Sequence, residues 1–180
     1  MTALVNAMAG RQGFSVRAAG EAPAQFLTFL LGADMYAIGI LAVKEIIEYH
    51  GVTAMPQMPA CISGVINLRG AAVPVLDLAR RLQRPAAQAG KRTCIIVVEA
   101  GHAEAPLLVG ILVDAVNAVL DIPPADIEPV PALGAVVRAD LLHGIGKIGG
   151  RFVLLLNVQT VVADREIAAM AAQPDELQAA

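Results

Sequence analysis

Two charged residues, Glu45 and Arg69, are the first candidates for chemistry in this chain. Arg69 and Gly70 separate two β-prone runs of Gly64–Leu78, which predicts a strand, a tight turn at a glycine and a second strand. Glu45 stands in an apolar segment, so we expect it to be partly buried and to need a partner. Arg69 is a candidate for that partner, and a solvated arginine at a turn is the alternative.

The segment Gly144–Gly149 matches the letters of a GxGxxG dinucleotide-binding motif. Such a site needs glycines that follow a strand and open a helix. Here the glycines stand inside an expected hairpin, and the β-prone run Arg151–Leu156 follows them, so we interpret them as turn and packing residues. The sequence also has no GxxxxGK(S/T) phosphate-binding loop, and we expect no cofactor.

Nucleophilic and metal-dependent catalysis lack their usual residue patterns. The two serines, Ser15 and Ser63, stand in no GxSxG sequence. The three histidines, His50, His102 and His143, are far apart and show neither HxxH nor HExxH spacing. We therefore expect no catalytic set and no metal site.

Three other residues leave alternatives open. Asp114 interrupts an apolar run, and it is either a buried functional acid or a strand-end carboxylate that accepts backbone hydrogen bonds. The only cysteines, Cys61 and Cys94, are enough for one disulfide. Because Cys94 stands in an apolar run, we favour buried, reduced thiols in a reducing cytoplasm.

The composition is that of a β-rich protein with an aliphatic core. Of the 180 residues, 57% are hydrophobic, 16% are charged and only 3% are aromatic. The net charge of −3 and the unclustered Lys and Arg residues oppose nucleic-acid binding. No apolar run reaches the roughly 18 residues that a membrane span needs, and we recognise no secretory signal, so we expect a cytoplasmic location.

Apolar runs bounded by turn-forming residues predict about nine or ten short strands and no long helix. This spacing is typical of sandwiches and barrels and argues against parallel βαβ units. Outside Gly64–Leu78, the predicted strands are Gln25–Leu31, Met35–Ile40, Thr93–Glu99, Leu107–Val113, Ala115–Asp121, Leu141–Ile148 and Arg151–Leu156.

Some positions make specific structural predictions. Pro74 lacks a backbone donor, which predicts an edge strand or a bulge. Asp77 and Asn157 are expected to cap the N-termini of short helices. The segment Leu41–Ile47 fits either a helical turn or an irregular strand, and Asp126–Ala132 is expected to be a loop.

Four segments, in order along about Gln25–Ala169, resemble the CheW-like chemotaxis coupling proteins. The family's first hairpin and V-x-E-I segment are similar to QFLTFLLGADMYAIGILAVKEI. Its motif G-V-x-N-x-R-G-x-x-V/I-P-V/I-x-D-L is matched by GVINLRGAAVPVLDL. Its G-I/L-x-V-D-x-V-x-x-V-L/I segment is similar to VGILVDAVNAVLDI, and its closing hairpin and helix are similar to LLHGIGKIGGRFVLLLNVQTVV.

The resemblance implies an all-β fold of two small five-stranded SH3-like β-barrels on a shared apolar core, with short helices. It implies a non-enzymatic adaptor that couples the cytoplasmic tips of methyl-accepting chemoreceptors to the regulatory domain of the histidine kinase CheA. Such an adaptor supports array assembly and kinase control, and reaches the membrane only through the receptors. The alternative is a CheW-like regulatory module of another signalling system, such as pilus motility, or of a larger kinase.

The resemblance also implies which residues bind receptor or kinase. In the family the matching Arg and Glu are tied to this coupling, which supports the suggested pair of Arg69 with Glu45; the valines are also candidates for the core. The implied binding residues are Val43, Glu45, Gly64, Asn67, Leu68, Arg69, Val116 and Val119.

The expected domain organisation follows from the extent of the matching segments. Residues 25–169 would form a CheW-like domain of two barrel subdomains. Residues 1–24 would be a disordered N-terminal tail, and residues 170–180 a loose C-terminal tail.

Overall fold

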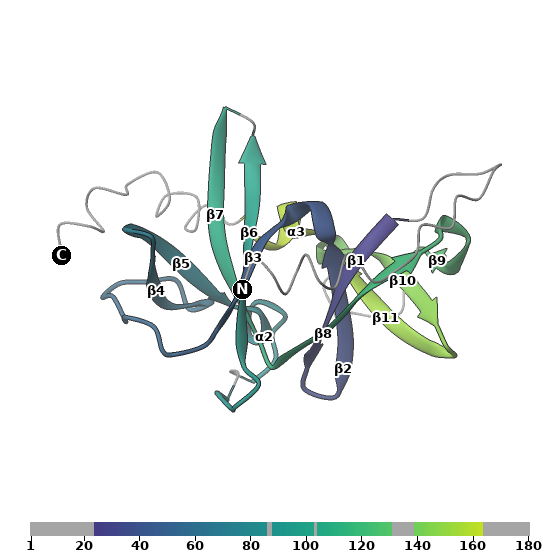
Figure 1. Ribbon diagram of the computed structural model, residues 1–180, viewed down its shortest axis with the longest axis horizontal. Helices are drawn as coiled ribbons and strands as arrows, with labels where there is room; N and C mark the ends of the chain where they lie inside the picture. Colours follow the sequence, from purple (N-terminus) through teal and green to yellow (C-terminus); the bar gives the residue numbers. More distant parts are fainter. Residues whose placement is uncertain (1–23, 86–87, 103, 131–138, 164–180) are drawn as a thin grey trace.

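Two β-sheets, each curled into an SH3-like barrel, form the protein in a computed structural model that describes residues 24–85, 88–102, 104–130 and 139–163 (Figure 1). The predicted all-β class with short helices is confirmed. The expected tails lie outside the described residues, apart from Ala24, which begins the first strand. Within the described residues, no helix combines the length and apolar character needed to cross a membrane.

The first sheet has six strands in the order β8-β1-β2-β11-β10-β9, one more than expected. The additional strand is β9, which pairs with β10. It lies in the segment Asp126–Ala132, which was expected to be a loop. Gly144 makes this pairing possible, because a Cβ there would lie 2.9 Å from the carbonyl oxygen of Glu128. The strands are β1 (Ala24–Leu31), β2 (Asp34–Gly39), β8 (Ala115–Ile122), β9 (Ile127–Glu128), β10 (Leu142–Ile148) and β11 (Arg151–Leu156).

The second sheet has five strands, the number expected for each barrel, in the order β3-β6-β7-β5-β4. Most neighbours are antiparallel, but β5 runs parallel to β7, as β2 does to β11 in the first sheet. The strands are β3 (Val43–Glu48), β4 (Ile62–Leu68), β5 (Ala71–Asp77), β6 (Cys94–His102) and β7 (Ala105–Val113).

The position of Pro74 differs from the predicted edge, because β5 lies between β7 and β4. Its partner in β4, Val65, exchanges backbone hydrogen bonds with Thr53 on the opposite side, so the nitrogen of Pro74 points away from β4. On the side of β7, pairing begins only at Val75. The missing donor of Pro74 therefore costs the sheet no hydrogen bond, and the register shift that a bulge produces lies in β4.

The chain crosses between the two sheets at two points. After β2 it passes through a 3-10 turn, η1 (Ile40–Ala42), into β3, so the ambiguous segment Leu41–Ile47 is part helical turn and part strand. It returns at Asp114, whose Oδ2 accepts a hydrogen bond of 2.6 Å from the N–H of Gly32. The N–H of Asp114 donates to Leu30 O at 3.1 Å. The backbone-bonded interpretation of Asp114 therefore describes the structure.

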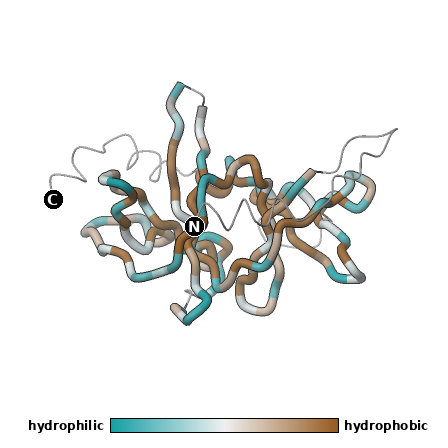
Figure 2. Tube along the Cα trace, in the orientation of Figure 1, coloured by the Kyte–Doolittle hydropathy of each residue, from teal (hydrophilic) through white to brown (hydrophobic). Residues whose placement is uncertain are grey.

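One large apolar cluster joins the two barrels, and this confirms the shared core. It includes Phe29 of β1 in the first sheet and Ile96 and Ile111 of β6 and β7 in the second, all at most 1% exposed. Each barrel also encloses a smaller cluster of its own. Figure 2 shows hydrophobic residues along the strands and crossings, with hydrophilic residues at several hairpin ends. Burial of this shared surface holds the two barrels together.

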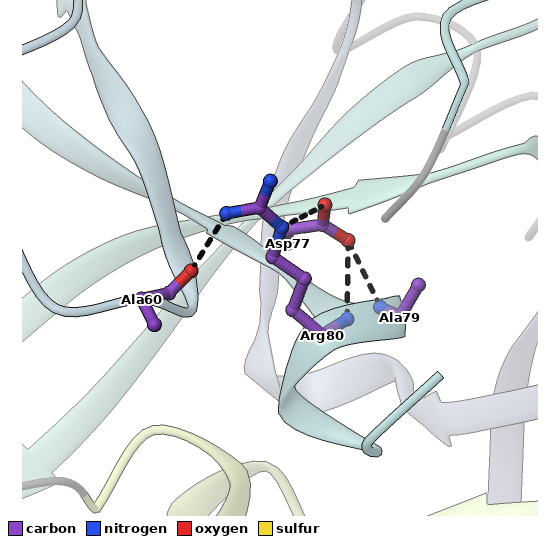
Figure 3. Close-up of polar contacts among 4 residues, drawn as sticks. All are labelled: Ala60, Asp77, Ala79 and Arg80. Carbon is purple, nitrogen blue, oxygen red and sulfur yellow. Dashed lines mark hydrogen bonds and ion pairs between the residues drawn. The ribbon is translucent and has the colours of Figure 1, made fainter. Parts of the chain in front are cut away.

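Two short α-helices begin at the predicted caps, α2 (Leu78–Arg81) and α3 (Val158–Val161). The side chain of Asp77 accepts hydrogen bonds from the N–H groups of the second and third residues of the first turn (Figure 3). Asn157 does the same for the N–H of Thr160. Both caps are thus confirmed. Two more 3-10 turns are η2 (Pro124–Asp126) and η4 (Ala139–Leu141).

Candidate functional site

The suggested pairing of Arg69 with Glu45 is confirmed. Nη2 of Arg69 lies 3.1 Å from Oε2 of Glu45, a distance that makes both a hydrogen bond and an ion pair. The two partners differ in environment, because the Glu45 side chain is 8% exposed and the Arg69 side chain is 74% exposed. The carboxylate is therefore buried at the base of the pair, and the guanidinium presents its remaining donors to solvent.

The ion pair also joins the two ends of the second sheet. Glu45 lies in β3 and Arg69 follows β4, and these strands are first and last in the sheet order. Beside this closure, Thr53 forms a bridge with Val65, with two backbone hydrogen bonds of 2.9 Å. Gly64 permits the close approach, because a Cβ there would lie 2.5 Å from Thr53 O. The glycine of the motif thus serves barrel closure directly.

A strained turn presents Arg69 to solvent. Arg69 has a φ of +52° and Gly70 a φ of +87°, so both residues of the β4–β5 turn are left-handed. The side chain of Asn67 accepts a 2.8 Å hydrogen bond from the N–H of Gly70 and stabilises the turn. A left-handed arginine is unusual, and no sequence signal predicted it. The neighbouring Leu68 is half-buried against the interior of the second barrel.

Val43 lies in the chain between the first crossing of the sheets and Glu45. It is half-buried against the shared core at the start of β3, two residues before Glu45. A register shift between Val43 and Glu45 places Lys44 at an irregularity of the β3–β6 ladder. Lys44 forms an exposed ion pair of 3.0 Å with Glu99 of β6.

The other two implied residues lie in the first barrel, on β8. Val119 is 1% exposed inside the shared core, where it contributes packing. Val116 is half-buried against the same core. The structure therefore does not bring these valines into one cluster with the ion pair, although the core contacts both barrels.

An open apolar groove of about 540 Å³ lies where the chain crosses from the first barrel to the second. Leu41, in η1, is 98% exposed beside it, which is extreme for a leucine. None of the binding residues implied by the family resemblance lines this groove. Its lining residues include Gln25, Phe26, Ile40, Leu41, His143, Leu156, Val158 and Gln159.

The side chains that could ligate a metal ion are dispersed in the described part of the chain. Among the described residues, no three His, Cys, Asp or Glu side chains are grouped as they would be to hold a metal ion. Cys61 and Cys94 form no disulfide, and both are only partly buried, so the expectation of buried thiols is wrong. Burial raises the pKa of the Cys94 thiol, which keeps it protonated and unreactive at neutral pH.

Comparison with known proteins identifies the family. A model of the CheW-like domain matches residues 25–166. "Chemotaxis protein CheW" of Klebsiella aerogenes is 34% identical over 161 residues, which cover 89% of this chain and 95% of that protein. "Protein FrzA" of Myxococcus xanthus is 33% identical over 126 residues, covering 70% of this chain and 76% of that protein.

The fold agrees with this similarity. The crystal structure of the scaffolding protein TtCheW from Thermoanaerobacter tengcongensis superimposes with a TM-score of 0.71 and 29% identity, covering 80% of this chain and 95% of that one. The family-model match, the similarity to curated relatives and the two-barrel fold all point to one family, and the chain belongs to the CheW-like family.

Proposed function

We propose that this protein is a chemotaxis adaptor that links the cytoplasmic tips of chemoreceptors to the regulatory domain of the histidine kinase CheA. The observation that carries the proposal is a CheW-like fold that combines an apolar groove at the barrel crossing with a separate, charged turn on the second barrel. One chain thereby offers two chemically different surfaces.

The groove suits an amphipathic helix of a receptor tip. Helix-in-groove recognition uses apolar side chains at helical spacing against a shallow hydrophobic surface. Leu41 and Phe26 supply apolar groups to the lining of the groove, and Gln25, His143 and Gln159 add polar groups to it. Leu41 is the exposed anchor in this arrangement, because its burial on binding removes nearly a whole leucine from water.

The turn of Arg69 suits the kinase. Its guanidinium keeps free donor positions while Glu45 fixes its direction, which is the arrangement that favours a directional contact with carboxylate or backbone oxygens. Asn67 and Leu68 shape the same hairpin, and Val43 lies between this face and the groove. Such an adaptor works in the cytoplasm by holding two partners, and it needs no catalytic step.

A binding experiment with two exposed hydrophobic residues tests the proposal. Leu41 and Phe152 are the exposed large hydrophobic residues of the described chain, but only Leu41 lines the groove. We expect Leu41→Glu to abolish binding of a soluble receptor-tip fragment and Phe152→Glu to preserve it, as measured by calorimetry. Equal affinity in both variants would refute the groove as the receptor site.

A second candidate is a CheW-like module of another motility system. It is favoured by the 33% identity to Protein FrzA of Myxococcus xanthus, a relative that is not named as a chemotaxis protein. Co-purification of the chain from its own cells, followed by identification of the bound kinase and receptor, separates the two candidates.

A further inference from the structure

The short helix α3 forms one wall of the groove. Val158 and Gln159 of this helix line the groove, as does its cap Asn157. With only four residues, α3 cannot hold its own position, because so short a helix is unstable without tertiary contacts. The shape of the groove therefore depends on what fixes α3.

Three of the hydrogen bonds that fix α3 come from the second barrel. Arg81, at the end of α2, donates from Nε to Val161 O at 2.9 Å and from Nη2 to Thr160 O at 3.4 Å. Gln159 accepts a 3.0 Å hydrogen bond from the N–H of Gly101 in β6. On the side of the first barrel, the N–H of Asn157 donates to Leu141 O at 2.9 Å. The helix thus bridges the two barrels.

Arg81 contacts the C-terminal end of α3. The last carbonyls of a helix lack partners within the helix and carry partial negative charge. The Arg81 guanidinium donates to Val161 O and adds a longer contact to Thr160 O, which also accepts from the N–H of Ala163 at 3.2 Å. Its positive charge complements the partial negative charge at this end of the helix. The Arg81 side chain does not line the groove, so any effect on groove binding must pass through α3.

Its neighbour Arg80 provides a natural contrast. Arg80 donates from Nη1 to Ala60 O at 3.0 Å, and its Nε lies 3.7 Å from Oδ2 of Asp77 (Figure 3). These partners belong to the second barrel and its own connections. Two adjacent arginines on one helix therefore differ in one respect that matters here: Arg81 reaches the groove wall and Arg80 does not.

We propose that Arg81 is a positioning residue that sets the receptor affinity of the groove by holding α3 from the second barrel. The inference rests on the proposed function of the groove. The receptor site then depends on both barrels. Its α3 wall follows β11 of the first barrel, but Arg81 of α2 in the second barrel holds that wall in place.

Binding measurements on matched variants test this. The probes are a soluble helical fragment of a chemoreceptor tip and the isolated CheA regulatory domain, each titrated into the full chain. We expect Arg81→Gln to weaken receptor-fragment binding about tenfold, within the usual range of coupling between sites. Arg80→Gln should change it less than about twofold, and Arg81→Lys should recover part of the affinity, because one ammonium can still donate to a carbonyl.

Two readouts separate positioning from general destabilisation. Kinase-domain affinity should stay at the wild-type level in Arg81→Gln, whereas a loosened fold would weaken both probes. Amide hydrogen exchange should accelerate at Val161 of α3 and at its C-cap Val162, and remain unchanged in β5.

The outcomes distinguish the positioning role of Arg81 from the receptor-binding role of the groove. Unchanged receptor binding in Arg81→Gln, or equal losses in Arg80→Gln and Arg81→Gln, would overturn the positioning role. If Leu41→Glu blocks the receptor fragment while Arg81→Gln does not, only this inference fails. If Leu41→Glu binds normally, the groove is not the receptor site and both proposals fail.

Discussion

Glu45 and Arg69 form an ion pair in which one partner is buried and the other is exposed, 8% against 74% of each side chain. The pair closes the second barrel between β3 and the β4–β5 turn. Removal of Arg69 and removal of Glu45 should therefore change the free energy of unfolding by different amounts. Only the Glu45 carboxylate is buried, so only this group is left without water when its partner is removed.

Arg69→Ala should lower the free energy of unfolding by about 1 to 2 kcal/mol, since it leaves the buried Glu45 carboxylate without its charged partner. The pair of Lys44 with Glu99, in which both side chains remain about half exposed, gives the control, and Lys44→Ala should cost less than about 0.5 kcal/mol. Urea unfolding measures both. A cost for Arg69→Ala no larger than that of Lys44→Ala would show that the buried carboxylate does not depend on Arg69.

Arg69→Gly should be less destabilising than Arg69→Ala by roughly 0.5 to 1 kcal/mol. Both variants lose the ion pair, but glycine adopts the φ of +52° without strain whereas alanine does not. Comparison of the two midpoints in the same urea titration isolates the backbone term. The reverse order of stability would contradict a strained left-handed turn.

Gly64→Ala should destabilise the protein by about 2 to 3 kcal/mol, because the new methyl group would meet Thr53 O at 2.5 Å and force the closure of the barrel apart. Gly39→Ala is the control, since a Cβ at Gly39 meets nothing within 4 Å. Thermal unfolding of the two variants checks the difference. If Gly64→Ala unfolds at the wild-type temperature, the bridge between Thr53 and Val65 does not constrain the barrel.

Stability should fall as the pH rises above about 10, and Tyr36 should be one cause. Burial raises the pKa of the Tyr36 hydroxyl, and the nearby Arg84 lowers it by a smaller amount. Because the folded pKa is above the unfolded one, the unfolded state loses its proton first, and deprotonation favours unfolding in that range.

Tyr36→Phe tests this linkage. The variant loses the 3.2 Å hydrogen bond from Nη1 of Arg84 to the Tyr36 hydroxyl, so it should be less stable at pH 8. Its free energy of unfolding should nevertheless decline less steeply above about pH 10 than that of the wild type. Parallel declines in the two proteins would remove Tyr36 from the explanation.

Local sequence patterns predicted the elements that depend on neighbouring residues. The caps at Asp77 and Asn157 and the two-residue turn at Gly149 and Gly150 follow from side-chain and backbone chemistry within a few positions. The expected burial of Glu45 suggested its pairing with Arg69, and the family resemblance supported this contact, which no local pattern specifies.

Features that depend on distant contacts were not predictable in the same way. Pro74 fits an interior strand only because the β7 ladder begins one residue later, and β9 exists only because Gly144 leaves room for it. The groove arises from η1, the start of β1 and α3, which are far apart in sequence. Leu41 carried no signal until the fold showed it to be exposed.

The central claim is that one chain holds a receptor and a kinase at two separate surfaces. Analytical ultracentrifugation of the chain with a receptor-tip fragment and the CheA regulatory domain tests this most directly. We predict a ternary complex, reduced by Leu41→Glu to the binary complex with the kinase domain. Mutual displacement of the two partners from the wild-type chain would contradict the claim.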